Sequence, residues 1–270
     1  MIMVQVTKFD GRREEFSREK IIHTCLRVGA SHEKASSIAD KIEKILYEGI
    51  TTREIYDAVK KELASHEKTM AAVYGLREYV SAMDPVIFEK FVQKILEAHG
   101  YKCEYNKLIE GMCVEHQIDI VASNEKRYLV ECKRHTNPHR FSGLGVCLQV
   151  EARLEDVREG FENKKNNFRF DNAWIITNTK FSEHAKKYAA AKSIRLTGWR
   201  YPDESSFEKM IDEKKLYPIN VLKAKKDVAD KLVNNGIITI QDISEDSLSH
   251  ACIESSVARK LLEQKKSLSI

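Results

Sequence analysis

The first part of the chain has the pattern of a short hairpin followed by helices. Asp10-Gly11 lies between two extended segments, and both residues tolerate the positive φ of a tight turn. Apolar residues then recur every three or four positions in four successive stretches, which is the period of an amphipathic helix. Thr51 and Glu54 form a capping-box pattern at the start of the third stretch. The pattern predicts a hairpin plus a four-helix bundle over residues 1–83.

The pattern changes after Met83-Asp-Pro85, because proline disfavours a helical conformation at the residue before it. Helical and strand-like runs alternate from here to about residue 203, which predicts an α/β unit with a mixed sheet and helices on its faces. Helices are expected at 86–98, 144–161 and 182–192, and strands near 117–122, 128–133, 173–177 and 193–199.

Residues 213–270 are expected to form a C-terminal helical hairpin domain. One helix ends at Asn235-Gly-Ile and a second contains Val257, an order that resembles a helix-hairpin-helix unit. In that motif, small glycines let backbone amides contact phosphate. The turn before Val257 reads Ala251-Cys-Ile-Glu, so we expect the fold without this contact. Nearby cations that could add non-specific charge are Lys223, Lys225 and Lys226.

Composition narrows the class of protein only a little. The 270 residues are 42% hydrophobic and 32% charged, with a formal net charge of +4, which permits nucleic-acid binding through a local patch. No apolar run approaches the roughly 20 residues of a membrane span. Charged residues come early, at Lys8 and Asp10, where a signal peptide would be apolar, so we expect a cytoplasmic protein.

The six cysteines contain no Cys-x-x-Cys pair. A zinc site is conceivable from Cys113, His116, Cys132 and His135. Strand alternation turns Cys132 away from its neighbours, however, so free and mostly buried thiols are the simpler interpretation.

Candidate chemistry lies on the two middle strands. Asp119 is on the first, and Glu131 and Lys133 are two positions apart on the second, so their side chains share a face. Carboxylates supply hard oxygen ligands for Mg²⁺, and a lysine can orient the attacking water or offset charge on phosphorus. The pattern indicates metal-assisted phosphodiester hydrolysis; a surface hairpin with ordinary charges is the alternative.

The residues around these strands resemble the catalytic domain of Mrr-type restriction endonucleases, within the PD-(D/E)XK superfamily. The resemblance runs from Val86 to about Tyr201. It rests on separate segments in the right order: Phe88-Glu-Lys-Phe-Val-Gln-Lys-Ile-Leu, His99-Gly-Tyr, Gly111 to Asp119, Glu131-Cys-Lys, and Trp174-Ile-Ile-Thr-Asn-Thr-Lys-Phe-Ser-Glu-His-Ala. It implies a restriction endonuclease-like catalytic domain over 84–203 and a Mg²⁺- or Mn²⁺-dependent endodeoxyribonuclease of type IV.

The same resemblance implies the site residues. Asp119, Glu131, Lys133 and the helical Gln149 carry over as catalytic residues, and Glu89 joins Asp119 and Glu131 as a metal ligand. One departure is the approach to the site, which reads Glu115-His-Gln-Ile-Asp where the family has Asp-Gly-Gly-Ile-Asp. The loop after Lys133 either grips a DNA backbone or is a plain polar loop.

Residues 1–83 resemble an ATP-cone, the nucleotide-sensing module of ribonucleotide reductases. The matching segments are Val6-Thr-Lys-Phe-Asp-Gly-Arg-Arg-Glu, Phe16-Ser-Arg-Glu-Lys-Ile, Gly49-Ile-Thr-Thr and Ala72-Val-Tyr-Gly-Leu-Arg. The resemblance implies a regulatory site for ATP or dATP. It carries phosphate contacts over to Lys8, Lys20 and Arg12, and places Val6, Ile21 and Thr52 around the base. Phe9 departs from the family, which usually has a second cation there.

Together these patterns predict an ATP-binding, metal-dependent endonuclease acting on double-stranded DNA as a homo-oligomer, in its simplest form a dimer. The chain has no Gly-x-x-x-x-Gly-Lys-Ser/Thr loop, so nucleotide binding is expected to regulate rather than drive it. Two alternatives remain open: a structure-selective nuclease such as a Holliday-junction resolvase, and a nucleotide-responsive DNA-binding regulator whose nuclease fold is inactive.

Overall fold

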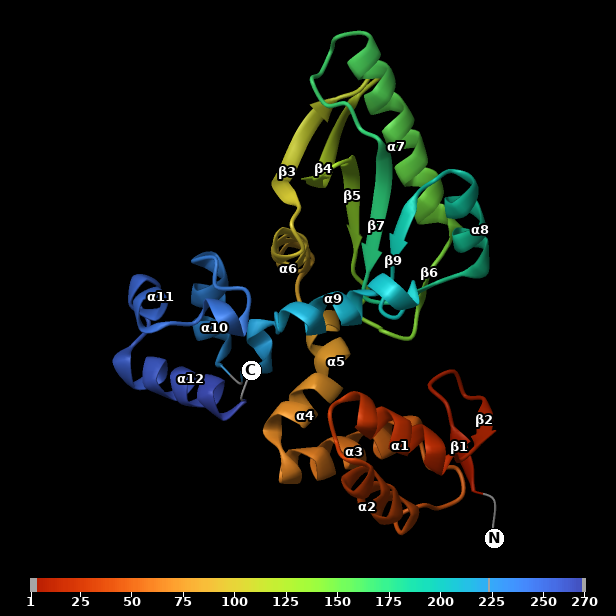
Figure 1. Cartoon of the computed structure of the whole chain (residues 1–270), viewed down its shortest axis with the longest axis vertical. Coiled ribbons are helices and arrows are strands. Elements are labelled where there is room, and N and C mark those ends of the chain that lie inside the picture. Colours follow the sequence, from red (N-terminus) through yellow and green to blue (C-terminus); the bar gives the residue numbers. More distant parts are fainter. Residues whose placement is uncertain (1–3, 223, 269–270) are drawn as a thin grey trace. The chain divides into compact units, whose positions relative to one another are not determined.

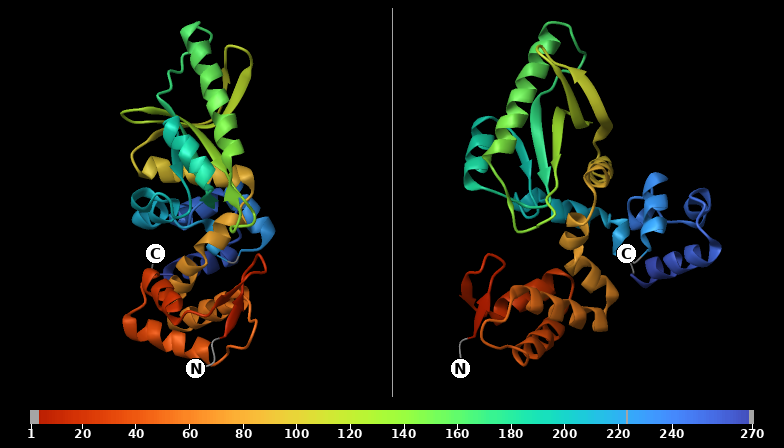
Figure 2. Two further views of the ribbon diagram at one scale, coloured as in Figure 1. Left: turned by 90° about the vertical axis from the view of Figure 1, so that its right-hand side faces the viewer. Right: turned by 180° about the vertical axis from the view of Figure 1, so that it is seen from behind.

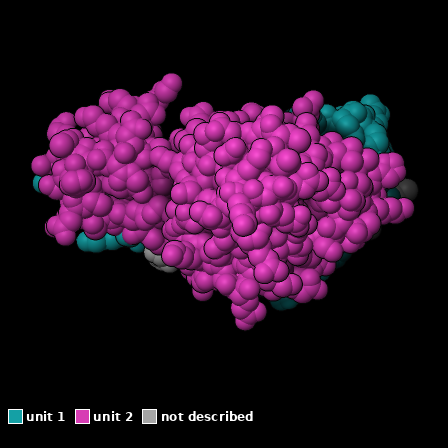
Figure 3. Space-filling model, turned by 90° about the horizontal axis from the view of Figure 1, so that it is seen from above, with its two compact units in different colours: residues 1–76, 259–270 teal, residues 77–258 magenta. Residues whose placement is uncertain are grey.

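The computed structural model describes residues 4–222 and 224–268, and Lys223 therefore lies outside the described part. The chain divides into two compact units, shown in different colours in Figure 3. Unit 1 comprises residues 1–76 and 259–270, and unit 2 comprises residues 77–258. The separate C-terminal domain from residue 213 stays a prediction.

Unit 1 is a small antiparallel hairpin packed on helices, as the sequence predicts. Val6 on β1 joins Ile22, Ile38, Val59 and Leu63 in one buried core. The elements are β1 (Gln5–Thr7), β2 (Arg13–Glu15), α1 (Arg18–Arg27), α2 (His32–Glu43), α3 (Thr52–His66) and α4 (Lys68–Tyr74).

Local signals fix the ends of these helices. Gly11 turns the hairpin with a φ of 82°. The hydroxyl of Ser17 accepts a hydrogen bond from the backbone of Lys20 and caps α1, and the predicted capping box between Thr51 and Glu54 opens α3. The predicted fourth helix is in fact two, α4 and α5 (Leu76–Ser81), separated at Gly75.

Unit 2 is built on a mixed five-stranded sheet with the order β3-β4-β5-β7-β9 (Figure 1). The strands are β3 (Lys102–Glu110), β4 (Glu115–Ser123), β5 (Arg127–Lys133), β7 (Asn172–Thr177) and β9 (Arg195–Thr197). β4 runs antiparallel to both of its neighbours, β3 and β5, and β7 and β9 then continue parallel to β5. The fold is thus the predicted mixture of α and β, with β5 at the centre of the sheet.

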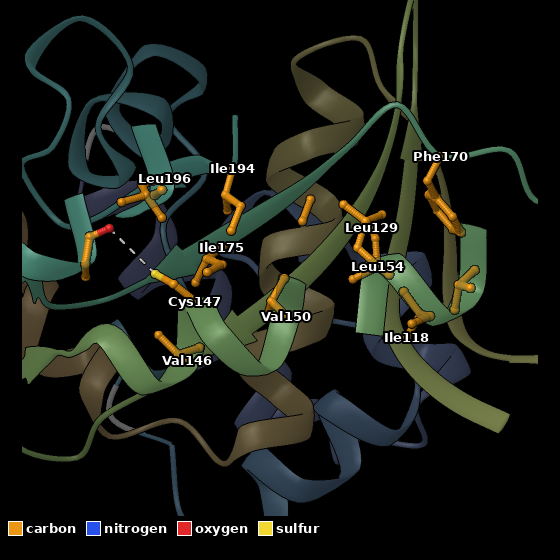
Figure 4. Packing of buried hydrophobic residues seen from close by; sticks show 14 of the residues in the cluster. Ile118, Leu129, Val146, Cys147, Val150, Leu154, Phe170, Ile175, Ile194 and Leu196 are labelled. Carbon is orange, nitrogen blue, oxygen red and sulfur yellow. Dashed lines mark hydrogen bonds between the residues drawn. The ribbon is translucent and has the colours of Figure 1, made fainter. Parts of the chain in front are cut away.

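Helices cover both faces of this sheet. α7 (Leu144–Glu162) and α8 (Glu183–Ala191) lie along one face, as the views in Figure 2 show. Val150 and Leu154 of α7 pack there against Leu129 and Ile175 of the central strands (Figure 4). α6 (Pro85–Ala98) contacts β3, β4 and β5 and also α9 (Phe207–Lys214), through the rings of Phe88, Phe91 and Phe207.

A second, smaller sheet lies beside the end of β5. It pairs β6 (Phe141–Ser142) with β8 (Lys180–Phe181) in parallel, with Phe141 opposite Lys180 and Ser142 opposite Phe181. Neither strand was predicted from the sequence, and nor was β3.

The chain after the sheet is helical. Its elements are η1 (Asp203–Ser205), α9, η2 (Ile219–Val221), α10 (Lys226–Asn234), η3 (Ile240–Asp242), α11 (Glu245–His250) and α12 (Ser255–Ser267). The predicted two helices are α10 and α12, and α11 lies between them. Cys252, in the turn before α12, has a φ of 52°, a conformation that glycine adopts more readily. No helix in the described part of the chain is long and apolar enough to cross a membrane.

Candidate active site at the fork of β4 and β5

The predicted carboxylates lie where β4 and β5 separate. Regular pairing of the two strands runs from Ser123 opposite Arg127 to Ile120 opposite Val130, and goes no further. At the next position the carboxylate of Asp119 takes the place of a backbone acceptor: its Oδ2 accepts a hydrogen bond from the backbone N–H of Cys132, at 2.7 Å. The side chain of Asp119 is therefore held against β5, beside Glu131.

The strand is irregular at this level. Ile118 and Val121 both belong to the core under α7 although an odd number of positions separates them, so the alternation of faces is interrupted around Asp119. On the neighbouring β3, the register places Asn106 opposite Asp119, and its φ is 51°. Asp119 itself is only half-buried, although Ile118 and Ile120 on either side of it are buried.

Glu131 is held from the other side by α7. Its Oε2 accepts a hydrogen bond from the Arg153 guanidinium at 2.6 Å, and both side chains are mostly shielded from solvent. Gln149 lies one turn before Arg153 and hence on the same side of α7, with its side chain exposed.

The carboxylates of the fork repel one another. Burial, and then the negative charge of Glu131, raise the pKa of Asp119 to about 7. Burial also raises the pKa of Glu89 on α6, with a further contribution from Glu131 and an opposing one from a hydrogen bond that Tyr105 donates at 3.0 Å. The structure thus brings Asp119, Glu131 and Glu89 within electrostatic reach of one another.

Lys133 ends β5 with an exposed side chain. Its carbonyl oxygen accepts a hydrogen bond from the hydroxyl of Thr177, at 2.6 Å, which ties the end of β5 to the end of β7. The amine is therefore free to extend from a fixed backbone position two residues beyond Glu131.

A divalent cation fits the chemistry of Asp119 and Glu131. The negative charges of the two carboxylates repel one another, and this repulsion contributes to the raised pKa of Asp119. A hard cation bound between them would remove the repulsion. Mg²⁺ needs only one or two protein carboxylates, because water and substrate phosphates complete its shell. Among residues 4–222 and 224–268, no three His, Cys, Asp or Glu side chains converge as a preformed metal cage, so the third predicted ligand, Glu89, is not part of one.

The alternative zinc ligands are not brought together. His116 lies 2.7 Å from Asp156 on α7, and Cys113 is exposed in the turn between β3 and β4. All six cysteines are free, but only Cys25 and Cys147 are buried, so the expectation of mostly buried thiols is wrong.

In unit 1, one acid joins the predicted phosphate-binding lysines. Glu14 on β2 forms ion pairs with both Lys8, at 2.9 Å, and Lys20. Hydrogen bonds from Lys20 and then Lys8 lower the pKa of Glu14 to about 2. The two lysines therefore converge on a single anionic group, although Lys8 follows β1 and Lys20 lies on α1.

The other residues predicted to bind the nucleotide differ in their environments. Val6 is buried in the unit core, and Ile21 packs against that core. Thr52 begins α3 beside Thr51, which bridges to Thr7 of β1. Arg12 is largely exposed and bound to Asp10 at 2.7 Å, so the structure does not bring it to the lysines.

Sequence reasoning missed three residues of these sites. Arg153 could have been found because it follows Gln149 by four positions on one helix, which places both on the same face. Tyr105 lies on the unpredicted strand β3, and Glu14 belongs to a charge-rich stretch with no distinctive spacing. Neither Tyr105 nor Glu14 carries a signal of its own.

A mixed sheet with a carboxylate pair at the fork of two strands, followed by a lysine, is the arrangement expected of a nuclease-type hydrolase domain. Comparison with known families agrees. Residues 80–199 match the restriction endonuclease family, and residues 4–79 match the ATP cone domain. The chain therefore belongs to the restriction endonuclease family and carries an ATP cone domain on the N-terminal side of its nuclease domain.

Similar proteins extend this picture. An uncharacterized protein of Archaeoglobus fulgidus is 38% identical over 177 residues, which cover 64% of this chain and 97% of that protein. A crystal structure of a protein of unknown function matches with a TM-score of 0.61 and 36% identity over 68% of this chain and 98% of its own. The transcriptional repressor NrdR of Crocosphaera subtropica is 29% identical over 99 residues, or 31% of this chain and 53% of the repressor.

Proposed function

We propose that this chain is a metal-dependent DNA endonuclease whose ATP cone is a regulatory module. The observation that carries the proposal is the fork of β4 and β5, where Asp119 is fixed beside Glu131 and Lys133 follows on the same strand. Membership of the restriction endonuclease family supports phosphodiester hydrolysis as the chemistry.

Each side chain has a separate task in this proposal. A divalent cation held by Asp119 and Glu131 would polarise the scissile phosphate and lower the pKa of bound water. Lys133 orients the attacking water and offsets the charge that develops on phosphorus. Arg153 and the N–H of Cys132 each hold one carboxylate oxygen, which limits the rotation of Glu131 and Asp119. Gln149 is suited to a substrate phosphate or sugar.

The direct test is cleavage of supercoiled plasmid, a four-way junction and methylated duplex, each with Mg²⁺, Mn²⁺ or chelator. We expect nicking that requires a divalent cation and disappears in Asp119→Asn. Metal-independent cleavage, or full cleavage by the variant, would place the chemistry elsewhere. The preferred substrate among the three separates a restriction enzyme from a structure-selective nuclease.

For the ATP cone we propose ATP or dATP as the ligand, bound through Lys8 and Lys20. Their convergence on Glu14 supports this, because two cations that already share one anion are positioned for a phosphate group. Val6, Ile21 and Thr52 are proposed to frame the base, and Arg12 to reach a phosphate only after leaving Asp10. Isothermal titration with ATP, dATP and ADP tests the set.

A second function has one observation in its favour. One relative of this chain is a transcriptional repressor, which keeps open a nucleotide-responsive DNA-binding regulator. Such a regulator would bind duplex DNA in a nucleotide-dependent way and show no cleavage with any metal. The pairing of Asp119 with Glu131 favours the nuclease, because a protein that only binds DNA gains nothing from keeping two repelling carboxylates together.

A further inference from the structure

The small sheet beside the fork presents an aromatic ring to solvent. Phe141 on β6 is 59% exposed and has two cations as backbone neighbours: Arg140 precedes it in the chain, and Lys180 lies opposite it on β8. Both cations are also exposed. Single exposed apolar side chains are common on proteins and need no explanation by themselves. What distinguishes Phe141 is its position beside the proposed active site.

Phe141 stands close to the end of β5. The hydroxyl of Thr177 donates to the carbonyl of Lys133 and lies 3.1 Å from the hydroxyl of Ser142. One buried hydroxyl thus joins the backbone of the proposed catalytic lysine to the residue that follows Phe141. Since adjacent residues of a strand point to opposite faces, burial of Ser142 directs Phe141 outward.

The backbone under the ring is held firmly. Ser142 shares its hydroxyl with Thr177, with Thr179 at 3.2 Å and with the His135 ring at 3.0 Å. Asn178 adds hydrogen bonds to the backbone N–H and C=O of His135. A fully satisfied buried network of this kind rigidifies the segment it contains, so Phe141 is fixed in its exposed position.

The segment also lies in a positive field. Burial lowers the pKa of His135, and the charges of Lys133, Arg140 and Arg134 lower it further. Burial also lowers the pKa of His139, and the charges of Arg77 and Lys180 lower it further. The cations would attract a polyanion such as DNA. The aromatic ring among them adds a flat apolar surface on which a base can stack.

We infer that Phe141 stacks on a base of bound DNA next to the scissile phosphate, so that the nuclease favours DNA containing an unpaired or mismatched base. The inference rests on the proposed function, because it takes DNA as the substrate. A stacked aromatic wedge must unstack a base, and this costs least where the base is already unpaired or mismatched. Arg140 and Lys180 would hold the flanking phosphates.

The test compares binding of full-length protein, with Ca²⁺ in place of Mg²⁺, to a perfect duplex and to one with a central mismatch beside 2-aminopurine. Wild type should prefer the mismatched duplex and change the 2-aminopurine fluorescence. Phe141→Ala should weaken binding to the mismatched duplex by about 5- to 150-fold, the loss typical of one base–aromatic stack, and abolish the fluorescence change. Phe141→Trp should retain both, and Leu108→Ala, which removes another exposed apolar side chain, should behave as wild type.

Two results would overturn the inference while leaving the nuclease proposal intact: Phe141→Ala that binds both duplexes as wild type does, or Phe141→Leu that retains the fluorescence change. Wild type that binds neither duplex would overturn both proposals. Melting temperatures of all variants show whether a loss of binding is a loss of folding.

Discussion

At the scale of single residues, the two carboxylates of the fork are not equivalent. Glu131 has a cation partner in Arg153, whereas Asp119 has only a backbone N–H and feels the negative charge of Glu131. Burial raises the pKa of Asp119 to about 7, and the negative charge of Glu131 acts in the same direction. A bound cation would therefore favour the ionised form of Asp119.

Lys133→Ala should abolish cleavage and leave the fold and DNA binding nearly unchanged, because the side chain is exposed and contributes little to the core. The nicking rate and the melting temperature should be measured on the same preparation. Lys126→Ala removes an exposed lysine from the turn at the other end of the strand and serves as the control. Near-normal nicking in folded Lys133→Ala would remove this lysine from the chemistry.

Asp119→Asn and Glu131→Gln should each weaken Mn²⁺ or Mg²⁺ binding along with activity, because a neutral amide is a poor ligand for a hard dication. Calorimetric titration in the presence of uncleavable DNA measures this. Glu125→Gln, in the exposed turn after β4, controls for the change in net charge. Unchanged metal affinity in both site variants would contradict the assignment.

At the scale of elements, the turn between β3 and β4 is clamped to α7 by one carboxylate. Asp156 accepts hydrogen bonds from the backbone N–H of Cys113 at 2.8 Å and from His116 at 2.7 Å. Gly111 makes this approach possible, since a Cβ there would lie 2.0 Å from Oδ2 of Asp156. Burial alone would raise the pKa of Asp156, but the hydrogen bonds outweigh it and hold the pKa well below its usual range.

Asp156→Asn should lower the free energy of unfolding by about 1–3 kcal/mol at neutral pH, as expected when a donor loses a charged acceptor. A depressed pKa stabilises the fold above the unfolded value of about 3.9, and this stabilisation is lost as the pH falls below it. Denaturant unfolding at pH 7 and pH 3 should therefore show a difference between wild type and variant that shrinks with acidity. An equal difference at both values would mean that the clamp is not electrostatic.

Helices and strands could be predicted only where apolar residues recur at the spacing of a helix or a strand. β4, β5, β7 and the helices around them bury one face or more, and their expected bounds are close to the observed ones. β3 was missed because it is an edge strand on which only Ile109 is buried, so its sequence shows little alternation. The proposed site divides in the same way: Asp119, Glu131 and Lys133 follow from strand spacing, but Arg153 meets Glu131 only through the packing of α7.

At the scale of the whole molecule, the ATP cone and the nuclease unit have separate cores, so a nucleotide can act on the nuclease only by favouring one arrangement of units or protomers over another. ATP or a non-hydrolysable analogue should therefore change the oligomeric state and the cleavage rate together. Light scattering and nicking assays with and without the analogue measure this. Confirmed binding with both quantities unchanged would mean that the cone does not regulate this nuclease.

Removing either of the two lysines proposed to bind phosphate should weaken ATP binding by about 1.5–3 kcal/mol, the contribution of a hydrogen bond to a charged group. Lys8→Ala and Lys20→Ala should both do so, while Lys34→Ala on α2 should not. Calorimetry on the full chain gives the affinities. An equal effect of all three would indicate general attraction of the nucleotide rather than a site.

The distorted fork also has a thermodynamic consequence for the metal-free protein. A raised pKa means that Asp119 stabilises the fold while protonated and that this stabilisation is lost as the pH rises from about 4 through about 7. Asp119→Asn keeps an acceptor for Cys132 and discards the charge. This variant should therefore melt at a higher temperature than wild type at pH 8 and at nearly the same temperature at pH 4. If Asp119 serves the proposed nuclease, the active chain is the less stable of the two above neutral pH.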